Sequence, residues 1–133
     1  MPDHPLFMSL RHVDILNRRL AESQPLLELC SGLKRDLSLL YELHDGPDGG
    51  EVVWRTDFTR SRGIVFSLER SAGPIDVVIS CGYWDAIDAV QGKAAIPTPR
   101  GDVDAIEKIM ALLTSQEIQG CAVQVVFPIR PVV

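Results

Sequence analysis

The side chains best suited to acid–base or nucleophilic chemistry are few and scattered in this sequence. It has three histidines: His4 near the start, His12 on the polar flank of an expected helix, and His44 beside Asp45 at the entrance to a turn. Nucleophilic catalysis at neutral pH usually needs a histidine as the neighbouring base. Because no catalytic motif surrounds any of the three, we interpret them as exposed or half-exposed residues and expect no catalytic residue.

The cysteines Cys30, Cys81 and Cys121 lie far apart and form no C-x-x-C pair. Local spacing therefore builds neither a zinc ribbon nor a dithiol redox motif. The sequence also lacks metalloprotease, EF-hand and P-loop spacings, so we expect no metal and no cofactor. Free, mostly buried thiols are typical of a reducing compartment, which favours a cytoplasmic protein.

Asp76 is the carboxylate with the most chemical interest, because it lies within the apolar run of residues 75–79. In an apolar cavity, desolvation would raise its pKa and make it a usable acid or base. Strand alternation, however, places Ile75 and Val77 on one face and Asp76 on the opposite one. A solvent-facing residue is the simpler interpretation. An enzyme that uses Asp76 on a lipid-like substrate stays open as an alternative.

Length and composition restrict the class of protein. The chain has 133 residues, of which 46% are hydrophobic and 23% charged, and its formal net charge is −5. These values are typical of one folded domain, which we place at residues 1–133. The negative charge argues against a nucleic-acid partner, since a phosphate backbone attracts clustered positive charge. No apolar run approaches the length of a membrane span, so we expect no integral membrane segment.

Residues 5–32 show helical spacing of apolar side chains. These side chains recur at three- and four-residue steps, which predicts an amphipathic helix. They are Leu6, Leu10, Val13, Leu16 and Leu20. Ser23 and Pro25 then favour a new helix start, because proline is tolerated in the first turn, and Gly32 favours its end. The sequence therefore predicts two N-terminal helices.

From residue 36 to residue 80 the apolar period changes to two, which is typical of strands with one buried face. Four such segments are separated by turn-forming residues, with the densest turn at 45–50 and another break at 71–74. Short links join antiparallel neighbours, whereas a parallel crossover usually needs a dozen or more residues. We therefore predict an antiparallel four-stranded meander over 36–80.

Helical spacing returns at 83–92 and at 102–115, and residues 122–127 alternate as in a last strand. A loop with two prolines separates the two helical segments. This order of elements predicts an α+β fold, in which a mostly antiparallel five-stranded sheet is covered on one side by about four helices.

The order of elements and several short strings resemble the sterol carrier protein type 2 (SCP-2) lipid-binding domain family. The strings are the turn 45–50, the strand with Trp54, the turn with Gly63, the run 75–79, Gln91-Gly92-Lys93 and Gly101-Asp102. The resemblance covers nearly the whole chain. It implies a noncatalytic carrier with a hydrophobic tunnel between the sheet and the helices, which takes sterols, fatty acids or fatty acyl-CoA esters.

The sequence departs from the family pattern after Lys93. The family places a loop and its fifth strand before the position of Gly101, whereas seven residues intervene here and two of them are proline. The edge strand is therefore expected to be missing from its usual place. Whether the strand predicted at 122–127 replaces it after the last helix stays open; in that arrangement the terminal segment would also cover part of the tunnel mouth.

We expect apolar side chains from both layers to line the tunnel. They are Leu39, Trp54 and Phe66 from the sheet, and Trp84, Ile87, Val90, Ile106, Ile109, Met110 and Leu113 from the helices. The expected function is noncatalytic binding or transfer of a hydrophobic small molecule. An alternative is a protein–protein interaction module with a filled cavity, whose apolar edge strand within 122–127 pairs with a partner protein or with a second copy as a homodimer.

Overall fold

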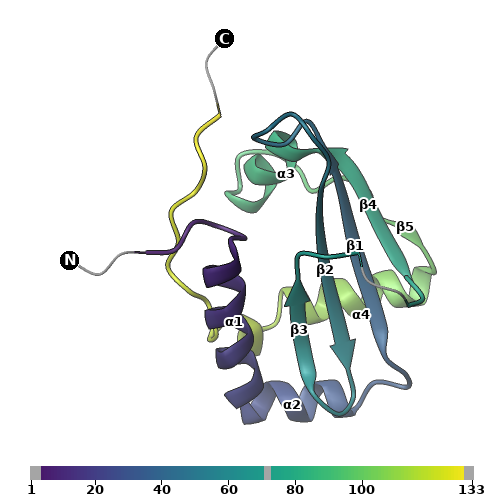
Figure 1. Cartoon of the computed structure of the whole chain (residues 1–133). Coiled ribbons are helices and arrows are strands. Elements are labelled where there is room, and N and C mark those ends of the chain that lie inside the picture. Colours follow the sequence, from purple (N-terminus) through teal and green to yellow (C-terminus); the bar gives the residue numbers. More distant parts are fainter. Residues whose placement is uncertain (1–3, 71–72, 131–133) are drawn as a thin grey trace.

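The computed structural model describes residues 4–70 and 73–130. Ser71 and Ala72, which belong to the predicted break at 71–74, lie outside the described residues, as do both ends of the predicted domain 1–133. The helices are α1 (Leu10–Glu22), α2 (Gln24–Ser31), α3 (Tyr83–Val90), α4 (Val103–Leu113) and α5 (Gln116–Gln119). The strands are β1 (Leu37–His44), β2 (Val52–Thr59), β3 (Gly63–Ser67), β4 (Val77–Gly82) and β5 (Arg100–Gly101) (Figure 1).

Side-chain caps mark where the longer helices begin. The Ser9 hydroxyl accepts a hydrogen bond from the His12 N–H at the start of α1, and the Ser23 hydroxyl serves the same purpose for α2. The Asp102 carboxylate caps α4. Such caps satisfy N–H groups that the first helical turn leaves without partners. Within the described ranges, no helix has the length and apolar content that crossing a membrane requires.

The sheet has five strands in the order β3-β2-β1-β4-β5. Three neighbouring pairs are antiparallel, namely β1 with β2, β2 with β3, and β4 with β5. The predicted fold class, α+β with a mostly antiparallel five-stranded sheet, is confirmed. The expected meander is wrong for β4, which pairs parallel with β1 instead of antiparallel with β3.

A short link accounts for this parallel pairing. Nine residues, 68–76, connect β3 to β4. Fully extended, they reach about 30 Å, whereas the three strand spacings from β3 to β4 amount to about 14 Å. The register removes the need for a long return: Ser67 pairs with Arg55, Arg55 with Leu40, and Leu40 with Val78, so β3 ends level with the beginning of β4. The rule that a parallel crossover needs a dozen residues therefore failed because β3 and β4 are offset along the sheet and the link runs mainly across it.

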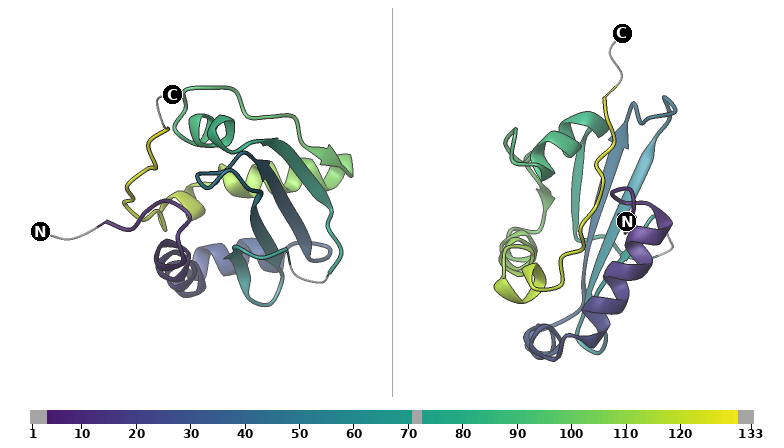
Figure 2. Two further views of the ribbon diagram at one scale, coloured as in Figure 1. Left: turned by 45° about the horizontal axis from the view of Figure 1, so that its top comes forward. Right: turned by 90° about the vertical axis from the view of Figure 1, so that its left-hand side faces the viewer.

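One face of the sheet carries the helices and the core. Leu37, Leu39, Tyr41 and Leu43 alternate along β1 and all pack into the buried apolar clusters on this face. Helix α4 places Ala105, Ile109 and Leu112 against the same face. Figure 2 shows α3, α4 and α5 gathered on one side of the strands. We call this the inner face.

Helix α1 covers the edge of the sheet at β3. The Asn17 side-chain amide donates to the carbonyl of Phe66 and accepts from its N–H, both at 2.8 Å. A single side chain thus occupies backbone groups that an edge strand would otherwise offer to another strand. This edge is therefore closed to further pairing at Phe66.

Residues 122–127 do not form the expected last strand. Their ladder-like contact is an isolated parallel bridge, in which the Phe7 N–H donates to the Val126 carbonyl and the Val126 N–H donates to the Pro5 carbonyl, both at 2.9 Å. The sheet edges are already taken by β5 next to β4 and by α1 next to β3. The expectation that the fifth strand is missing from its usual place is also wrong, because β5 lies directly before α4.

The opposite, outer face carries a buried ionic cluster instead of helices. Arg55 on β2 is 5% exposed, and its guanidinium contacts the Asp57 carboxylate and the Ser38 hydroxyl. It also donates to the backbone carbonyl of Arg70, which follows β3. The Arg70 guanidinium in turn pairs with Glu42 on β1. Chain following β3 therefore covers part of this face.

Candidate functional site

A cavity of about 370 Å³ lies between the inner face and the surrounding helices. Sites that bind small organic molecules occupy about 300–1,000 Å³ and are mostly apolar. Residues from the sheet, from α1, α3, α4 and α5, and from the C-terminal segment, defined here as residues 122–130, form its wall. They are Phe7, Met8, His12, Leu16, Leu39, Tyr41, Trp54, Thr56, Phe66, Val90, Leu113, Ile118, Gln119, Ala122, Val123, Val125 and Phe127.

Five of the ten side chains that the sequence predicts as lining border this cavity: Leu39, Trp54, Phe66, Val90 and Leu113. The other five pack into the apolar clusters without bordering it: Trp84, Ile87, Ile106, Ile109 and Met110. On α4, the end of the helix reaches the cavity while the preceding turns fill the core against the sheet. Helical spacing identifies the inward side of a helix but does not separate core from cavity wall.

An aromatic cluster closes one end of the cavity. The Trp54 ring packs edge-on against Phe7 at 5.5 Å and against Tyr83 at 6.0 Å between ring centroids, and it is tilted against Tyr41 at 5.5 Å. The rings of Phe7 and Phe127 lie tilted by 33° with their centroids 4.9 Å apart. Such pairs add to the free energy of apolar burial. They join the beginning and the end of the chain above the sheet.

The C-terminal segment therefore covers the cavity, as expected for residues 122–127, but as extended chain and not as a strand. Ala122, Val123, Val125 and Phe127 contribute side chains to the wall. No local pattern marks this part of the lining, or Phe7 and Met8, because these residues meet only when the segments around Phe7 and Phe127 pack together over the sheet.

His12 is buried in this wall, which corrects the interpretation that it is exposed or half-exposed. It is 5% exposed, and its Nδ1 accepts a hydrogen bond from the Met8 N–H at 2.9 Å. Burial lowers the pKa of His12 below 6.5, because an imidazolium loses hydration there. The neutral ring with Nδ1 as acceptor carries its proton on Nε2. Met8 itself adopts φ 57°, a conformation that this loop holds in place.

Thr56 and Tyr41 add hydrogen-bonding groups from the sheet. Thr56 is 4% exposed and stands between Leu39 on β1 and Phe66 on β3, both of which also line the cavity. Burial raises the pKa of the Tyr41 phenol. No Lys, Arg, Asp or Glu occurs among the described residues of the wall. The cavity is therefore apolar with a few uncharged polar groups.

Asp76 lies outside this cavity. Its carboxylate accepts from the Ser38 N–H at 2.9 Å and pairs with the Arg35 guanidinium at 2.7 Å. These contacts attach the beginning of β4 to β1, and the side chain is mostly buried instead of facing solvent. Asp76 therefore stabilises the contact between the beginning of β4 and β1, and it does not line the apolar cavity.

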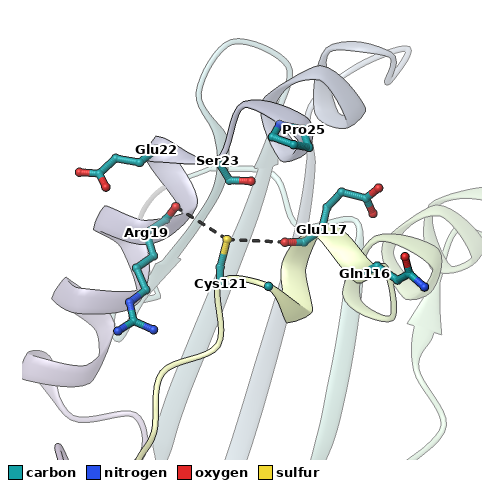
Figure 3. Close-up of a pocket in the computed structure, with 8 residues that line it drawn as sticks. Arg19, Glu22, Ser23, Pro25, Gln116, Glu117 and Cys121 are labelled. Atoms are coloured by element: carbon teal, nitrogen blue, oxygen red, sulfur yellow. Dashed lines mark hydrogen bonds between the residues drawn. The ribbon is translucent and has the colours of Figure 1, made fainter.

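A second, wider groove of about 650 Å³ opens between the end of α1 and α5. The Cys121 thiol donates to the backbone carbonyls of Arg19 and Glu117, and the charged ends of Arg19, Glu22 and Glu117 diverge from it (Figure 3). Because these charged groups do not converge on one point, the groove offers no set of ligands for a small molecule. The apolar cavity is the better candidate site.

Comparison with known proteins adds evidence on the fold. No protein-family model and no curated protein sequence matches the chain. A solved structure from Thermus thermophilus, described as a conserved hypothetical protein and possibly a sterol carrier protein, matches with a TM-score of 0.57 and 17% identity, over 91% of this chain and 92% of that one.

Two further solved structures have the same arrangement. Sterol carrier protein 2 matches with a TM-score of 0.55 and 15% identity, over 86% of this chain and 96% of that chain. The sterol carrier protein domain 2 of Helicoverpa armigera matches with a TM-score of 0.50 and 17% identity, over 87% and 91%. The strand order, the layer of helices and these similarities together show that the chain adopts an SCP-2-like fold.

Proposed function

We propose that this protein binds a small hydrophobic molecule in the cavity and carries it without changing it chemically. One observation carries the proposal: the space between the sheet and the helices is walled by apolar side chains, with no ionised group among the described lining residues. The SCP-2-like fold supports a lipid-binding or carrier role, since two of the similar structures are described as sterol carrier proteins.

In a cavity with such a wall, the size and the apolar surface of the ligand should determine how tightly it binds. Each methylene that leaves water contributes about 0.8 kcal/mol, so affinity should rise about fourfold per methylene until the cavity is full. Loss of ligand motion opposes this gain. We therefore expect a preference for ligands whose apolar body fills about 370 Å³.

The polar groups of the wall favour binding over catalysis. His12, Tyr41 and Thr56 reach the cavity, but no carboxylate among the described lining residues stands beside them to assist proton transfer. Asp76, the carboxylate considered for an enzyme, is engaged by Arg35 and Ser38 elsewhere in the fold. The alternative of an interaction module requires a cavity filled by side chains, which the open volume does not support.

Native mass spectrometry of freshly purified protein, followed by organic extraction of any bound lipid, tests the proposal. We expect a stoichiometric apolar ligand. Leu113→Trp fills one wall of the cavity and should abolish co-purification. Leu29→Trp makes the same substitution at an exposed position of α2 and should retain the ligand.

A protein that is bare when purified, and stays bare after incubation with fatty acids, long-chain alcohols and sterols, would overturn the proposal. Equal ligand content in Leu113→Trp and Leu29→Trp would also contradict it, because the ligand would then lie outside this cavity. Far-UV circular dichroism shows whether both variants keep the fold.

A further inference from the structure

Two polar side chains in the cavity wall are deeply buried and incompletely hydrogen-bonded. His12 and Thr56 are 5% and 4% exposed. Nδ1 of His12 has its partner in the Met8 N–H, whereas neither Nε2 of His12 nor Oγ1 of Thr56 has a partner among the described residues. Burying a hydrogen-bonding group without a partner is costly, so native proteins rarely do it.

Both residues border the cavity. Among the described residues, no buried side-chain nitrogen or oxygen is both sealed from solvent and unpaired. Since His12 and Thr56 each line the cavity, the cavity is the open space that Nε2 and Oγ1 reach. The two groups come from different walls, α1 and the middle of β2, and therefore approach one cavity from two elements.

The charge of this environment selects the kind of partner. The described wall has no ionised side chain, and burial favours the neutral form of His12. An anionic head group would lose its hydration without gaining a counter-charge. A neutral oxygen matches better, because it can accept from the His12 Nε2–H. A hydroxyl can in addition donate to Oγ1 of Thr56.

We propose that His12 and Thr56 form a polar anchor for the oxygen of a neutral amphiphile, which has an apolar body and one uncharged hydroxyl or carbonyl head. This inference rests on the proposed function and deepens it, since it names the ligand class and the two residues that select it. The anchor discriminates against ionised carboxylates of the same chain length.

Binding of three matched probes at pH 7.5 tests the anchor: 1-decanol, decanoate and 1-chlorodecane. Tryptophan emission reports binding, since Trp54 forms part of the wall. We expect 1-decanol to bind at least tenfold more tightly than decanoate. The chloroalkane has nearly the same apolar body without a hydrogen-bonding head. Its affinity therefore measures the contribution of apolar burial in the cavity alone.

Two variants remove the proposed hydrogen bonds separately. Thr56→Val replaces the hydroxyl by a methyl group, and His12→Asn keeps an acceptor for the Met8 N–H while it removes the Nε2 donor. Each should lower the affinity for 1-decanol three- to tenfold, as expected for the loss of one hydrogen bond. The affinity for 1-chlorodecane should stay within twofold. Thr98→Val makes the same change on an exposed loop and should alter neither probe.

The outcomes separate this inference from the proposed function. If both variants bind 1-decanol as the unchanged protein does, or if decanoate binds as tightly as 1-decanol, the anchor is wrong while hydrophobic binding stands. If the unchanged protein binds none of the three probes, the proposed function fails with it. Should His12→Asn unfold, Thr56→Val decides alone, because Thr56 has no hydrogen-bond partner to lose among the described residues.

Discussion

The two faces of the sheet bury polar side chains in opposite ways. On the outer face, the Arg55 guanidinium contacts Asp57, Ser38 and the Arg70 carbonyl, so its donors are used within the protein. On the inner face, the adjacent residue Thr56 is equally buried but has no hydrogen-bond partner among the described residues. Two neighbouring residues of one strand thus differ in whether the protein itself completes their hydrogen bonds.

This difference separates buried polar groups that stabilise the fold from buried polar groups that are available to a ligand. A buried polar group with internal partners stabilises one arrangement of the chain. Removing a partner therefore lowers the free energy of unfolding substantially. A buried polar group that borders an open cavity contributes little to the free energy of unfolding. It becomes useful when a ligand supplies the missing partner. Stability measurements, which do not depend on the identity of the ligand, can separate the two kinds of polar group.

The largest effect is expected for Arg55→Met. Breaking a buried ion pair costs about 3–5 kcal/mol. The Asp57 side chain is 28% exposed, so water offsets part of the cost, and we expect the free energy of unfolding to fall by about 2–3 kcal/mol. Urea denaturation measures the change, with exposed Arg18→Met as the matched control. A loss equal to that of Arg18→Met would show that the outer cluster is not structural.

A pair of threonines on β2 gives an intermediate effect. The Thr59 hydroxyl donates to the Gly63 carbonyl and accepts from the Arg62 N–H, so Thr59→Val should lower the free energy of unfolding by about 1–2 kcal/mol. Thr56→Val should leave it unchanged or raise it by up to about 1 kcal/mol, because its hydroxyl has no partner to lose among the described residues. Urea denaturation of ligand-free protein compares them. Equal losses in both variants would remove the contrast between the two hydroxyls.

The smallest effect concerns pH. Burial lowers the pKa of His12 below 6.5 in the folded chain, so between that pKa and 6.5 the unfolded chain binds more protons than the folded one. The contribution of neutral His12 to stability is therefore complete above about pH 6.5 and is lost as the pH falls through the folded pKa. His12→Asn lacks this titration.

Urea denaturation of both proteins between pH 8 and pH 5 measures the effect. The stability of the unchanged protein relative to His12→Asn should decrease on acidification. A constant difference across this range would mean that His12 titrates equally in both states and is not buried as described.

Much of the fold was predictable because it depends on local periodicity. Alternation along β1 indicates which side of the strand is apolar, and Leu39 indeed faces the helices. Leu39, Trp54 and Phe66 were expected on the cavity side for the same reason, and all three border the cavity. Whether they contact a ligand stays a prediction that the probe experiments address.

The errors lie where pairing depends on distant parts of the chain. Residues 122–127 alternate as a strand does, but the edges of the sheet are occupied by β5 and by α1 with Asn17, so the segment lies over the cavity instead. Likewise, two residues suffice for β5 beside Val77 and Val78, and no local pattern marks so short a strand. The homodimer through 122–127 stays a prediction; within the described residues this segment pairs through the isolated bridge between Leu6 and Val126.

Side-chain spacing of two or of three to four residues was enough to predict α1 to α4 and β1 to β4, their order and the apolar side of each. Tertiary structure alone decided the parallel neighbour of β1, the cover formed by the C-terminal segment, and the burial of His12. His12 lies on the polar flank of α1 when the helix is considered alone. It becomes part of an apolar wall only because Phe7 and Phe127, from opposite ends of the chain, pack together next to it.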